Sequence, residues 1–505
     1  MKTTIRTVLC IIGIMVFALI FCACSKTPTG QKIEVDGVSY TFSEFVWDKN
    51  KAQALYVSET DPSLTLSYDA EVSVEVLKEA TAEKAGEAMY TATYGELTDT
   101  KKDVLLADKI TLTVYATNDF HGAVPEGDNQ PGLGYLASYL NEKGKDGNTL
   151  LIDSGDTWQG SIYSNYNKGE LITQIFNYIH YDARTVGNHD FDCGVEALTH
   201  NTSLSYNGYQ TPVLAANVYD YDFPTMTVGK EQQSDIGQKS VVYTLDSGLK
   251  VGIVGVIGKD QITSIDSLYT QNICFIDHIK VIKEEATALR KAGCDVVICS
   301  IHAGEEDVRG NGLENYVDLV LCAHTHQLQS SYEGALLYAQ FRSSGEFIGQ
   351  IEMTYEPATG KVSSKSKAIN AAEVLNADLQ MDLSLWSLIK SYNDKCDNEA
   401  KAVVANNVYG YFYYKEQMPN LVARAVYDEC VKSGQNVDLV YVNKARESLN
   451  SRIWTYEDLY EAFPFDDMVY IVDVTGNEIL NEISQYNSIY RSPDFTENRI
   501  DRNKT

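Results

Sequence analysis

Residues 109–122 read KITLTVYATNDFHG and hold the pattern that decides the fold. Apolar side chains such as Ile110 and Leu112 alternate with polar ones, which predicts a β-strand with one buried face. A polar cluster that contains Asp119 and His121 follows the strand at once. The segment therefore predicts a strand that places two possible metal ligands, one residue apart, beyond its carboxyl end.

The same arrangement recurs through the middle of the chain. Residues 132–143 and 170–179 have the apolar spacing of helices. Further apolar runs that end in polar clusters predict strands within residues 148–156, 250–258, 295–304 and 318–327. Strands that alternate with helices in this way indicate an α/β domain with a largely buried sheet.

The polar clusters share one kind of chemistry, and five of the eight histidines of the chain lie in them. Because ligands of an open α/β sheet bind at the carboxyl ends of its strands, we expect the clusters to meet in space. Asp, His and Asn side chains suit divalent Mn, Fe, Co or Zn, and two such ions can clamp the oxygens of a phosphoryl displacement. The polar clusters contain Asp119, His121, Asp156, Asn188, His189, Asp192, His302, His324 and His326.

The order of these clusters resembles that of the calcineurin-like metallophosphoesterases. The shared motifs are Asp-x-His at 119–121, Gly-Asp-x-x-Gln-Gly at 155–160, Gly-Asn-His-Asp-Phe-Asp at 187–192, His-x-Gly at 302–304 and His-x-His at 324–326. The second and third motifs are similar to the 5′-nucleotidase branch, which includes UDP-sugar hydrolases and 2′,3′-cyclic phosphodiesterases. The resemblance implies an α/β fold of the α+β sandwich type, with a four-layer catalytic domain over residues 109–365.

The resemblance also implies two ions that share one carboxylate ligand. The implied ligands are Asp119, His121, Asp156 and His326 for one ion, and Asp156, Asn188, His302 and His324 for the other. His189 is then not a ligand but faces the phosphate, and Asp192 orients its imidazole. Asp190 stands where the family usually has Glu, a change that we expect to be mild.

The N-terminal segment has the pattern of a targeting sequence. A positive start at Lys2 and Arg6 precedes an apolar run, and polar residues follow Cys24. The pattern resembles a lipoprotein signal peptide over residues 1–24, with a lipid on Cys24 that attaches the chain to the membrane. The alternative is an uncleaved N-terminal anchor. Both place the body of the chain outside the cytoplasm, at the cell surface or membrane.

Two further parts flank the catalytic domain. Residues 25–108 alternate apolar and polar side chains, which predicts a small β-rich module to which we assign no chemistry. Residues 366–404 are expected to be a linker, with a long helix over residues 375–404. Residues 405–505 resemble the α/β substrate-binding domain of 5′-nucleotidases. That domain normally continues beyond the point at which this chain ends, so we expect it to be incomplete (truncated).

Three residues in this last part match positions that bind substrate in the 5′-nucleotidases. Phe465 matches an aromatic residue that stacks on the nucleobase, although a core position beside Phe463 is an alternative. Arg446 matches an arginine that can hold a phosphate or carboxylate through two hydrogen bonds. Lys415 stands where an arginine is usual.

Composition narrows the range of functions. The chain has 505 residues and a net charge of −29, which disfavours nucleic-acid polymers as partners. Its cysteines show no CxxC spacing and predict neither a disulfide framework nor a zinc knuckle. The resemblance to the 5′-nucleotidase branch implies a hydrolase of nucleoside 5′-monophosphates. The alternatives are a 2′,3′-cyclic nucleotide phosphodiesterase and 3′-nucleotidase, a UDP-sugar hydrolase or, in another class, a non-catalytic surface-binding protein.

Overall fold

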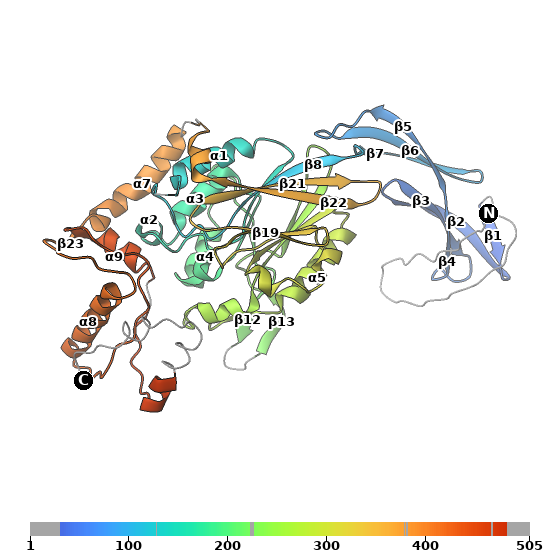
Figure 1. Ribbon diagram of the computed structural model, residues 1–505. Helices are drawn as coiled ribbons and strands as arrows, with labels where there is room; N and C mark the ends of the chain where they lie inside the picture. The colour runs from blue at the N-terminus through green and yellow to red at the C-terminus, as the bar shows by residue number, and fades with distance from the viewer. Residues whose placement is uncertain are drawn as a thin grey trace. The chain divides into compact units, whose positions relative to one another are not determined.

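The structure is a computed structural model that describes residues 31–127, 129–222, 227–377, 379, 382–465 and 468–481. The expected signal peptide and the expected lipidation site at Cys24 lie outside the described residues. The chain divides into two compact units (Figure 1). The first contains the residues up to Ile110 together with Thr244–Leu249 and Glu356–Thr359, and the second contains the remainder.

The first unit consists of two antiparallel sheets, with the strand orders β1-β2-β3-β4 and β5-β6-β7. The strands are β1 (Lys32–Val35), β2 (Val38–Asp48), β3 (Lys51–Ser58), β4 (Thr65–Asp69), β5 (Glu71–Lys78), β6 (Gly86–Tyr94) and β7 (Leu97–Leu105). Side chains of β6 alternate between buried and partly exposed, and its Tyr94 ring lies 5.5 Å from that of Tyr68. The segment therefore forms the strands that its alternating sequence predicts.

The second unit is built around two six-stranded sheets, with the orders β11-β10-β9-β8-β21-β22 and β14-β15-β17-β18-β20-β19. The first sheet comprises β8 (Ile110–Thr117), β9 (Thr149–Asp153), β10 (Ala183–Thr185), β11 (Val213–Leu214), β21 (Phe347–Glu356) and β22 (Lys361–Asn370). The second comprises β14 (Ser240–Thr244), β15 (Lys250–Ile257), β17 (Val296–His302), β18 (Leu319–Leu321), β19 (Leu328–Glu333) and β20 (Leu336–Phe341). Strands β8 to β11 pair in parallel, as do β15, β17, β18 and β20, so their carboxyl ends share one edge of each sheet.

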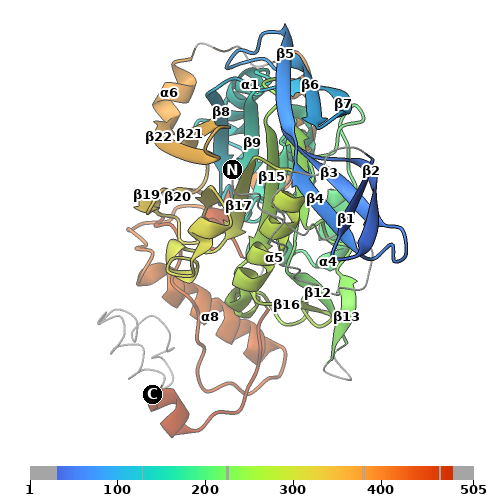
Figure 2. The same ribbon diagram turned by 90° about the vertical axis from the view of Figure 1, so that its right-hand side faces the viewer.

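Helices cover the outer faces of these sheets. Helices α1 (Gly132–Lys143) and α3 (Glu170–Ile179) share a core with Tyr115 of β8, whereas α5 (His278–Lys291) packs on β15 and β17 (Figure 2). Hydroxyl groups connect the two sheets, since Thr185 Oγ1 donates to Ser300 Oγ at 2.7 Å. The layers thus run helix, sheet, sheet, helix, which confirms the expected four-layer α/β fold.

Smaller elements complete the second unit around these layers. The helices are α2 (Ile162–Asn165) and α4 (Val195–Thr202), with 3₁₀ turns η1 (Asn188–Phe191), η2 (Lys259–Ser264), η3 (Glu305–Asp307) and η4 (Leu313–Asn315). A separate sheet has the order β13-β12-β16 and contains β12 (Val218–Asp222), β13 (Thr227–Gln233) and β16 (Ile273–Phe275). Of these elements, η1 is the one that carries residues of the expected site.

The helix expected over residues 375–404 is shorter than the sequence indicated. The chain instead forms a short α6 (Ala371–Leu375) and then α7 (Leu383–Ala400). The side chain of Asp382 accepts a hydrogen bond from the backbone N–H of Ser384 at 2.6 Å, which starts α7 anew as an N-cap. Helix α7 buries Leu385 and Cys396 in the same core as α3. It therefore packs on these layers and also links them to the residues that follow.

The last described part forms a small packed body. It contains β23 (Val403–Ala405), α8 (Gln417–Lys432), β24 (Trp454–Thr455) and α9 (Tyr456–Ala462). A small core around Met418 and Trp454 holds these elements together. Among the residues that the structure describes, no helix combines the length and the apolar character needed to cross a membrane. Four cysteines of the described residues are buried, namely Cys294, Cys299, Cys322 and Cys396.

We expect Asp182 to make stability depend on pH. Its carboxylate accepts a hydrogen bond from the backbone N–H of Leu151 at 2.8 Å, and burial raises its pKa to about 7. The folded state therefore prefers the neutral acid, so the stabilisation is complete below about pH 4 and is lost as the pH rises through about 7. Urea unfolding of the wild type should show a free energy about 2–3 kcal/mol lower at pH 8 than at pH 5 from this group alone. Asp182→Asn should remove that part of the slope, and an identical slope in both proteins would contradict the assignment.

Candidate metal centre

The loops that follow five parallel strands converge at one edge of the two sheets. Strand β8 leads to Asp119 and His121, β9 leads to Asp156, β10 leads to Asn188 on η1, β17 ends on His302, and β18 leads to His324 and His326. Two groups of potential ligands result, each with its donor atoms within 4.8 Å of one another. The groups are Asp119, His121 and His326, and Asp156, His302 and His324. The structure thus brings together residues that lie up to about two hundred positions apart.

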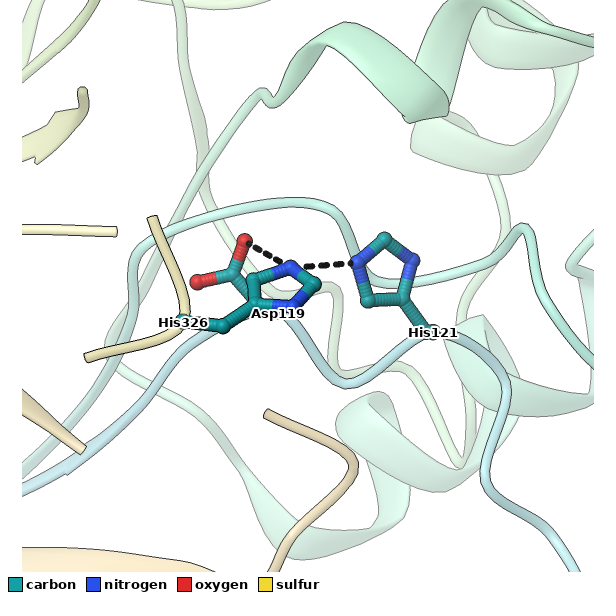
Figure 3. Close-up of side chains that lie close together, drawn as sticks. All are labelled: Asp119, His121 and His326. Atoms are coloured by element: carbon teal, nitrogen blue, oxygen red, sulfur yellow. Dashed lines mark hydrogen bonds and ion pairs between the residues drawn. The ribbon is translucent and has the colours of Figure 1, made fainter. Parts of the chain in front are cut away.

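The first group is compact. The Nε2 atoms of His121 and His326 lie 3.1 Å apart, and His326 Nε2 lies 3.5 Å from Asp119 Oδ1 (Figure 3). The imidazole of His121 is held by its other nitrogen, since Nδ1 donates to the backbone carbonyl of Gln159 at 2.8 Å. Nε2 therefore carries the lone pair and faces the other two ligands.

The second group is built in the same way. His302 is fully buried, and its Nε2 lies 3.1 Å from Asp156 Oδ2 and 3.1 Å from Asn188 Oδ1. Its Nδ1 donates to the backbone carbonyl of Ser154 at 2.8 Å. The ring of His324 lies 5.5 Å from that of His302. The side-chain oxygen of Asn188 therefore lies beside this group.

One carboxylate lies between the two groups. The same Asp156 oxygen that is 3.1 Å from His302 Nε2 is 4.0 Å from His121 Nε2 in the first group. Its other oxygen accepts a hydrogen bond from the backbone N–H of His189 at 2.7 Å, which fixes the orientation of the carboxylate. The position of Asp156 is therefore the one that a ligand shared by two ions would need.

The donor chemistry fits divalent cations. Burial lowers the pKa of His121 to about 4, so this imidazole is in its neutral, ligating form at neutral pH. Burial acts in the same sense on His302, but the Asp156 carboxylate outweighs it and raises the pKa of His302 to about 10. The carboxylate thus favours a positive charge beside it, which a bound divalent cation would supply in place of the proton. The oxygen and nitrogen donors match Mn, Fe, Co or Zn.

The backbone at several candidate ligands adopts a left-handed conformation that could not be predicted from the sequence. Of the thirteen non-glycine residues with positive φ in the described part of the chain, five are candidate ligands. They are Asp119, His121, Asp156, His324 and His326, with φ between 49° and 70°. Such left-handed residues cost of order 1–3 kcal/mol each and occur mainly where function requires them. Here Asp119 and His121 lie in the same ligand group, whereas His324 and His326 contribute to different groups.

Glycine is required where two of the loops touch. A Cβ on Gly187 would lie 2.2 Å from Asp156 Oδ1, and one on Gly155, whose φ is +95°, would lie 2.7 Å from the backbone nitrogen of Gly187. No other residue type fits in so little space. The two Gly residues of the motifs therefore allow the Asp156 loop and the Asn188 loop to lie in direct contact.

His189 lies beside this centre and belongs to neither of the two ligand groups. Its backbone N–H donates to Asp156 Oδ1 at 2.7 Å, and its Nδ1 donates to Asp192 Oδ2 at 2.7 Å. Burial alone would lower the pKa of this imidazole, but the carboxylates of Asp156 and Asp192 outweigh burial and raise it. His189 is therefore held in one orientation through Nδ1, and its basicity is increased.

Two of the three expected substrate residues reach this region. The Phe465 ring lies 5.0 Å from the His189 ring at 35°, and the Arg446 guanidinium carbon lies 5.0 Å from the Phe465 ring. Phe463 packs on the small core around Met418 and Trp454, whereas Phe465 is not part of that core. Lys415 instead lies with its ammonium group 5.4 Å from the ring of Tyr414.

Sequence reasoning missed several groups that hold the loops. Asn118 Nδ2 donates to Asp119 Oδ2 at 2.6 Å, and its Oδ1 accepts from the backbone N–H of Phe341 at 3.0 Å. Gln159 belongs to a recognised motif, but its role was not assigned: its carbonyl holds His121, and its side-chain amide donates to the carbonyl of Pro464. These contacts are mostly long-range, and the sequence carries no signal that could have revealed them.

Comparisons with known proteins agree with this architecture. Residues 112–328 match the model of the calcineurin-like phosphoesterase family. The chain is 26% identical to a 5′-nucleotidase of Diplobatis ommata over 59% of this chain and 54% of that protein. It is 23% identical to the endonuclease YhcR of Bacillus subtilis over 78% of this chain and 34% of that protein. The chain thus spans about half or less of the length of these two relatives.

A solved structure shows the same fold. The crystal structure of a 5′-nucleotidase precursor from Thermus thermophilus superimposes with a TM-score of 0.61 at 20% sequence identity. The match covers 76% of this chain and 80% of that chain. The likeness in fold therefore extends beyond the catalytic layers to most of the described chain.

Proposed function

We propose, on the match of residues 112–328 to the calcineurin-like phosphoesterase family, that this chain is a metal-dependent phosphomonoesterase that releases phosphate from nucleoside 5′-monophosphates outside the cytoplasm. The observation that carries the proposal is the single Asp156 oxygen placed 3.1 Å from His302 and 4.0 Å from His121. The names of relatives, among them a 5′-nucleotidase, support the substrate class.

The proposed metal centre uses the residues of the two groups together with Asn188. One ion is assigned to Asp119, His121, Asp156 and His326, and the other to Asp156, Asn188, His302 and His324. Two divalent ions supply positive charge that stabilises the negative charge developing on the phosphoryl oxygens. They also provide the attraction for an anionic substrate that a chain with a net charge of −29 otherwise lacks.

The protein's own groups then act on the leaving oxygen. We assign His189 as the general acid that donates a proton from Nε2 to the departing nucleoside oxygen. Its Nδ1–H remains hydrogen-bonded to Asp192 at 2.7 Å, which holds the ring in position and stabilises the imidazolium form. The raised pKa of His189 supports this role, since it keeps a larger share of the imidazole protonated near neutral pH.

Phe465 and Arg446 are proposed to bind the nucleoside part of the substrate. A flat aromatic ring stacks on any base, and such a stack contributes about 1–3 kcal/mol. The ring must exchange part of its contact with His189 for the base, because the two rings now lie 5.0 Å apart. Lys415 has its ammonium group 5.4 Å from the Tyr414 ring, and its place in substrate binding stays a prediction.

Phe465→Ala should therefore discriminate between substrates. We expect KM for AMP to rise about 5- to 100-fold, in line with the loss of one base stack. KM for p-nitrophenyl phosphate should change less than about threefold, because the metal centre and His189 bind the phosphate of both substrates. Phe465→Leu, which keeps apolar volume without a flat face, should resemble Phe465→Ala. An equal rise in KM for both substrates would contradict a base-stacking role.

Substrate ranking tests the proposed activity itself. Rates on AMP, 2′,3′-cyclic AMP and UDP-glucose should be highest on AMP. A clear preference for either of the other two would replace the proposal with the cyclic phosphodiesterase or the UDP-sugar hydrolase. A purified protein that holds no divalent metal and remains inert towards p-nitrophenyl phosphate with added Mn would instead support a non-catalytic surface-binding protein.

We also propose that the chain is anchored outside the cytoplasm through a lipid on Cys24. The support is the charged start, apolar run and polar sequence after Cys24. Metabolic labelling with a radioactive fatty acid should mark the wild type and leave Cys24→Ser unlabelled. Labelling of both proteins alike would refute lipidation at this cysteine.

A further inference from the structure

A buried carboxylate joins the two loops that touch at the metal centre. Asp190 is fully buried on η1, the same turn that carries Asn188. Its Oδ2 accepts a hydrogen bond from the backbone N–H of Gly187 at 2.9 Å, and its Oδ1 accepts one from the backbone N–H of Thr157 at 3.1 Å. One side chain therefore holds the loop of Asn188 and the loop of Asp156 in a single arrangement.

A buried arginine balances the charge of this carboxylate. Arg184, at 2% exposure on β10, places Nη2 3.3 Å from Asp190 Oδ2. Its guanidinium carbon lies 4.1 Å from the ring of Trp158, the residue after Thr157. Because neither charge reaches water, the removal of one partner leaves the other buried and uncompensated. The pair thus holds its geometry more tightly than a surface ion pair would.

The arrangement matters for the metal ligands because the two loops are in direct contact. Gly187 packs on Asp156 so closely that a Cβ would lie 2.2 Å from Asp156 Oδ1. The backbone N–H of His189, two residues after Gly187, donates to the same oxygen at 2.7 Å. A shift of the Gly187–His189 segment would therefore change the separation of Asn188 from Asp156. The ion assigned to Asn188 depends on both.

We propose that Asp190, held by Arg184, is a positioning residue that sets the separation of Asn188 from Asp156 and thereby the affinity of the ion that these two residues share. The inference rests on the proposed metal centre and adds a residue that touches no ion. It also changes how the Asp at this position is understood. Asp190 had no assigned role of its own in the sequence analysis, whereas in the structure its carboxylate accepts two backbone hydrogen bonds and lies 3.3 Å from Arg184 Nη2.

Asp190→Asn tests the proposal directly. The amide has the same shape, but its NH₂ group must face one of the two backbone N–H groups, so one loop loses its hydrogen bond. We expect the full-length protein, freed of metal with a chelator, to bind one Mn ion with wild-type affinity and the other at least about 10-fold more weakly. Calorimetric titration with Mn measures both steps without reference to turnover.

Asp318→Asn is the matched control. Asp318 Oδ2 accepts from Arg290 Nη2 at 2.5 Å and from the backbone N–H of Val297 at 2.7 Å, so it too is a carboxylate held by an arginine and the backbone, with one backbone donor where Asp190 has two. It lies before β18, at the end of the sheet opposite to His324. We expect a comparable loss of melting temperature and no change in either Mn affinity. Equal weakening in both variants would attribute the effect to general destabilisation and overturn the proposal.

The remaining outcomes are also decisive. Asp190→Asn with two wild-type Mn affinities would overturn the positioning role while leaving the metal centre intact. A wild type that binds fewer than two Mn ions would overturn the proposed function itself, and this inference with it. If Asp190→Asn does not fold, Arg184→Lys keeps the charge but lacks the planar fork that contacts both Asp190 and Trp158. That variant should weaken the same single ion about 3- to 10-fold, and unchanged affinities there would equally overturn the proposal.

Discussion

His189→Ala is expected to lower kcat by about 10²- to 10⁴-fold, the usual contribution of a general acid, while the protein keeps its divalent ions. The alanine retains the backbone N–H that donates to Asp156 Oδ1 at 2.7 Å, so the loop that carries Asn188 is undisturbed. What disappears is the imidazole held by Asp192 at 2.7 Å. The substitution therefore separates proton donation from metal binding.

Metal content, kinetics and two further variants test this expectation. Metal content by mass spectrometry should equal that of the wild type, and kcat for AMP should fall far more than KM. Asp192→Asn should show a smaller loss, because the imidazole remains but its orientation and basicity are no longer fixed. His200→Ala, a change of an exposed histidine on α4, should behave as wild type. Full activity of His189→Ala would refute the role assigned to the imidazole.

Asp156→Asn is expected to weaken the binding of both metal ions. Its Oδ2 lies 3.1 Å from His302 Nε2 and 4.0 Å from His121 Nε2, so the loss of its charge affects both groups. Changes beyond the ligands themselves commonly cost about 10- to 100-fold in metal affinity, and we expect the loss of the shared ligand to weaken both ions by more than about 100-fold. Turnover should fall at least in proportion.

A substitution at a ligand that belongs to one group alone provides the comparison for Asp156→Asn. His326→Ala removes an imidazole that lies 3.5 Å from Asp119 Oδ1 in the first group, and it should weaken that ion alone. Calorimetric titration with Mn distinguishes one weakened step from two. If Asp156→Asn retained either ion at wild-type affinity, the carboxylate would not be shared, and the proposed arrangement of ligands would be wrong.

Local sequence patterns predicted the framework well. The apolar spacing of residues 132–143 predicted a helix, and α1 spans Gly132–Lys143. The alternation after residue 109 predicted a strand, and β8 spans Ile110–Thr117. Both succeed because burial of one face is decided by neighbours within the element. The helix expected over residues 375–404 was too long, because the N-cap at Asp382 starts α7 only at Leu383.

The candidate ligands could be proposed from the sequence, but the contacts that hold their loops in place could not. Ordered motifs pointed to the ligands, because each motif is a short run that the sequence displays directly. The contacts of Asp190 with Thr157, 33 positions away, and of Asn118 with Phe341, 223 positions away, left no trace in those runs. Nor did the motifs show that Phe465 lies against His189.

The amino-acid sequence by itself determined where strands and helices form and which side chains end them, since both follow from interactions between residues close in the chain. Only the tertiary structure decided that His121 and His326, 205 positions apart, face each other at 3.1 Å, and that Asp156 lies between the two ligand groups. The physical reason is that these positions require left-handed backbone at the ligands. That conformation is unfavourable in isolation and persists only because the packed loops hold it in place.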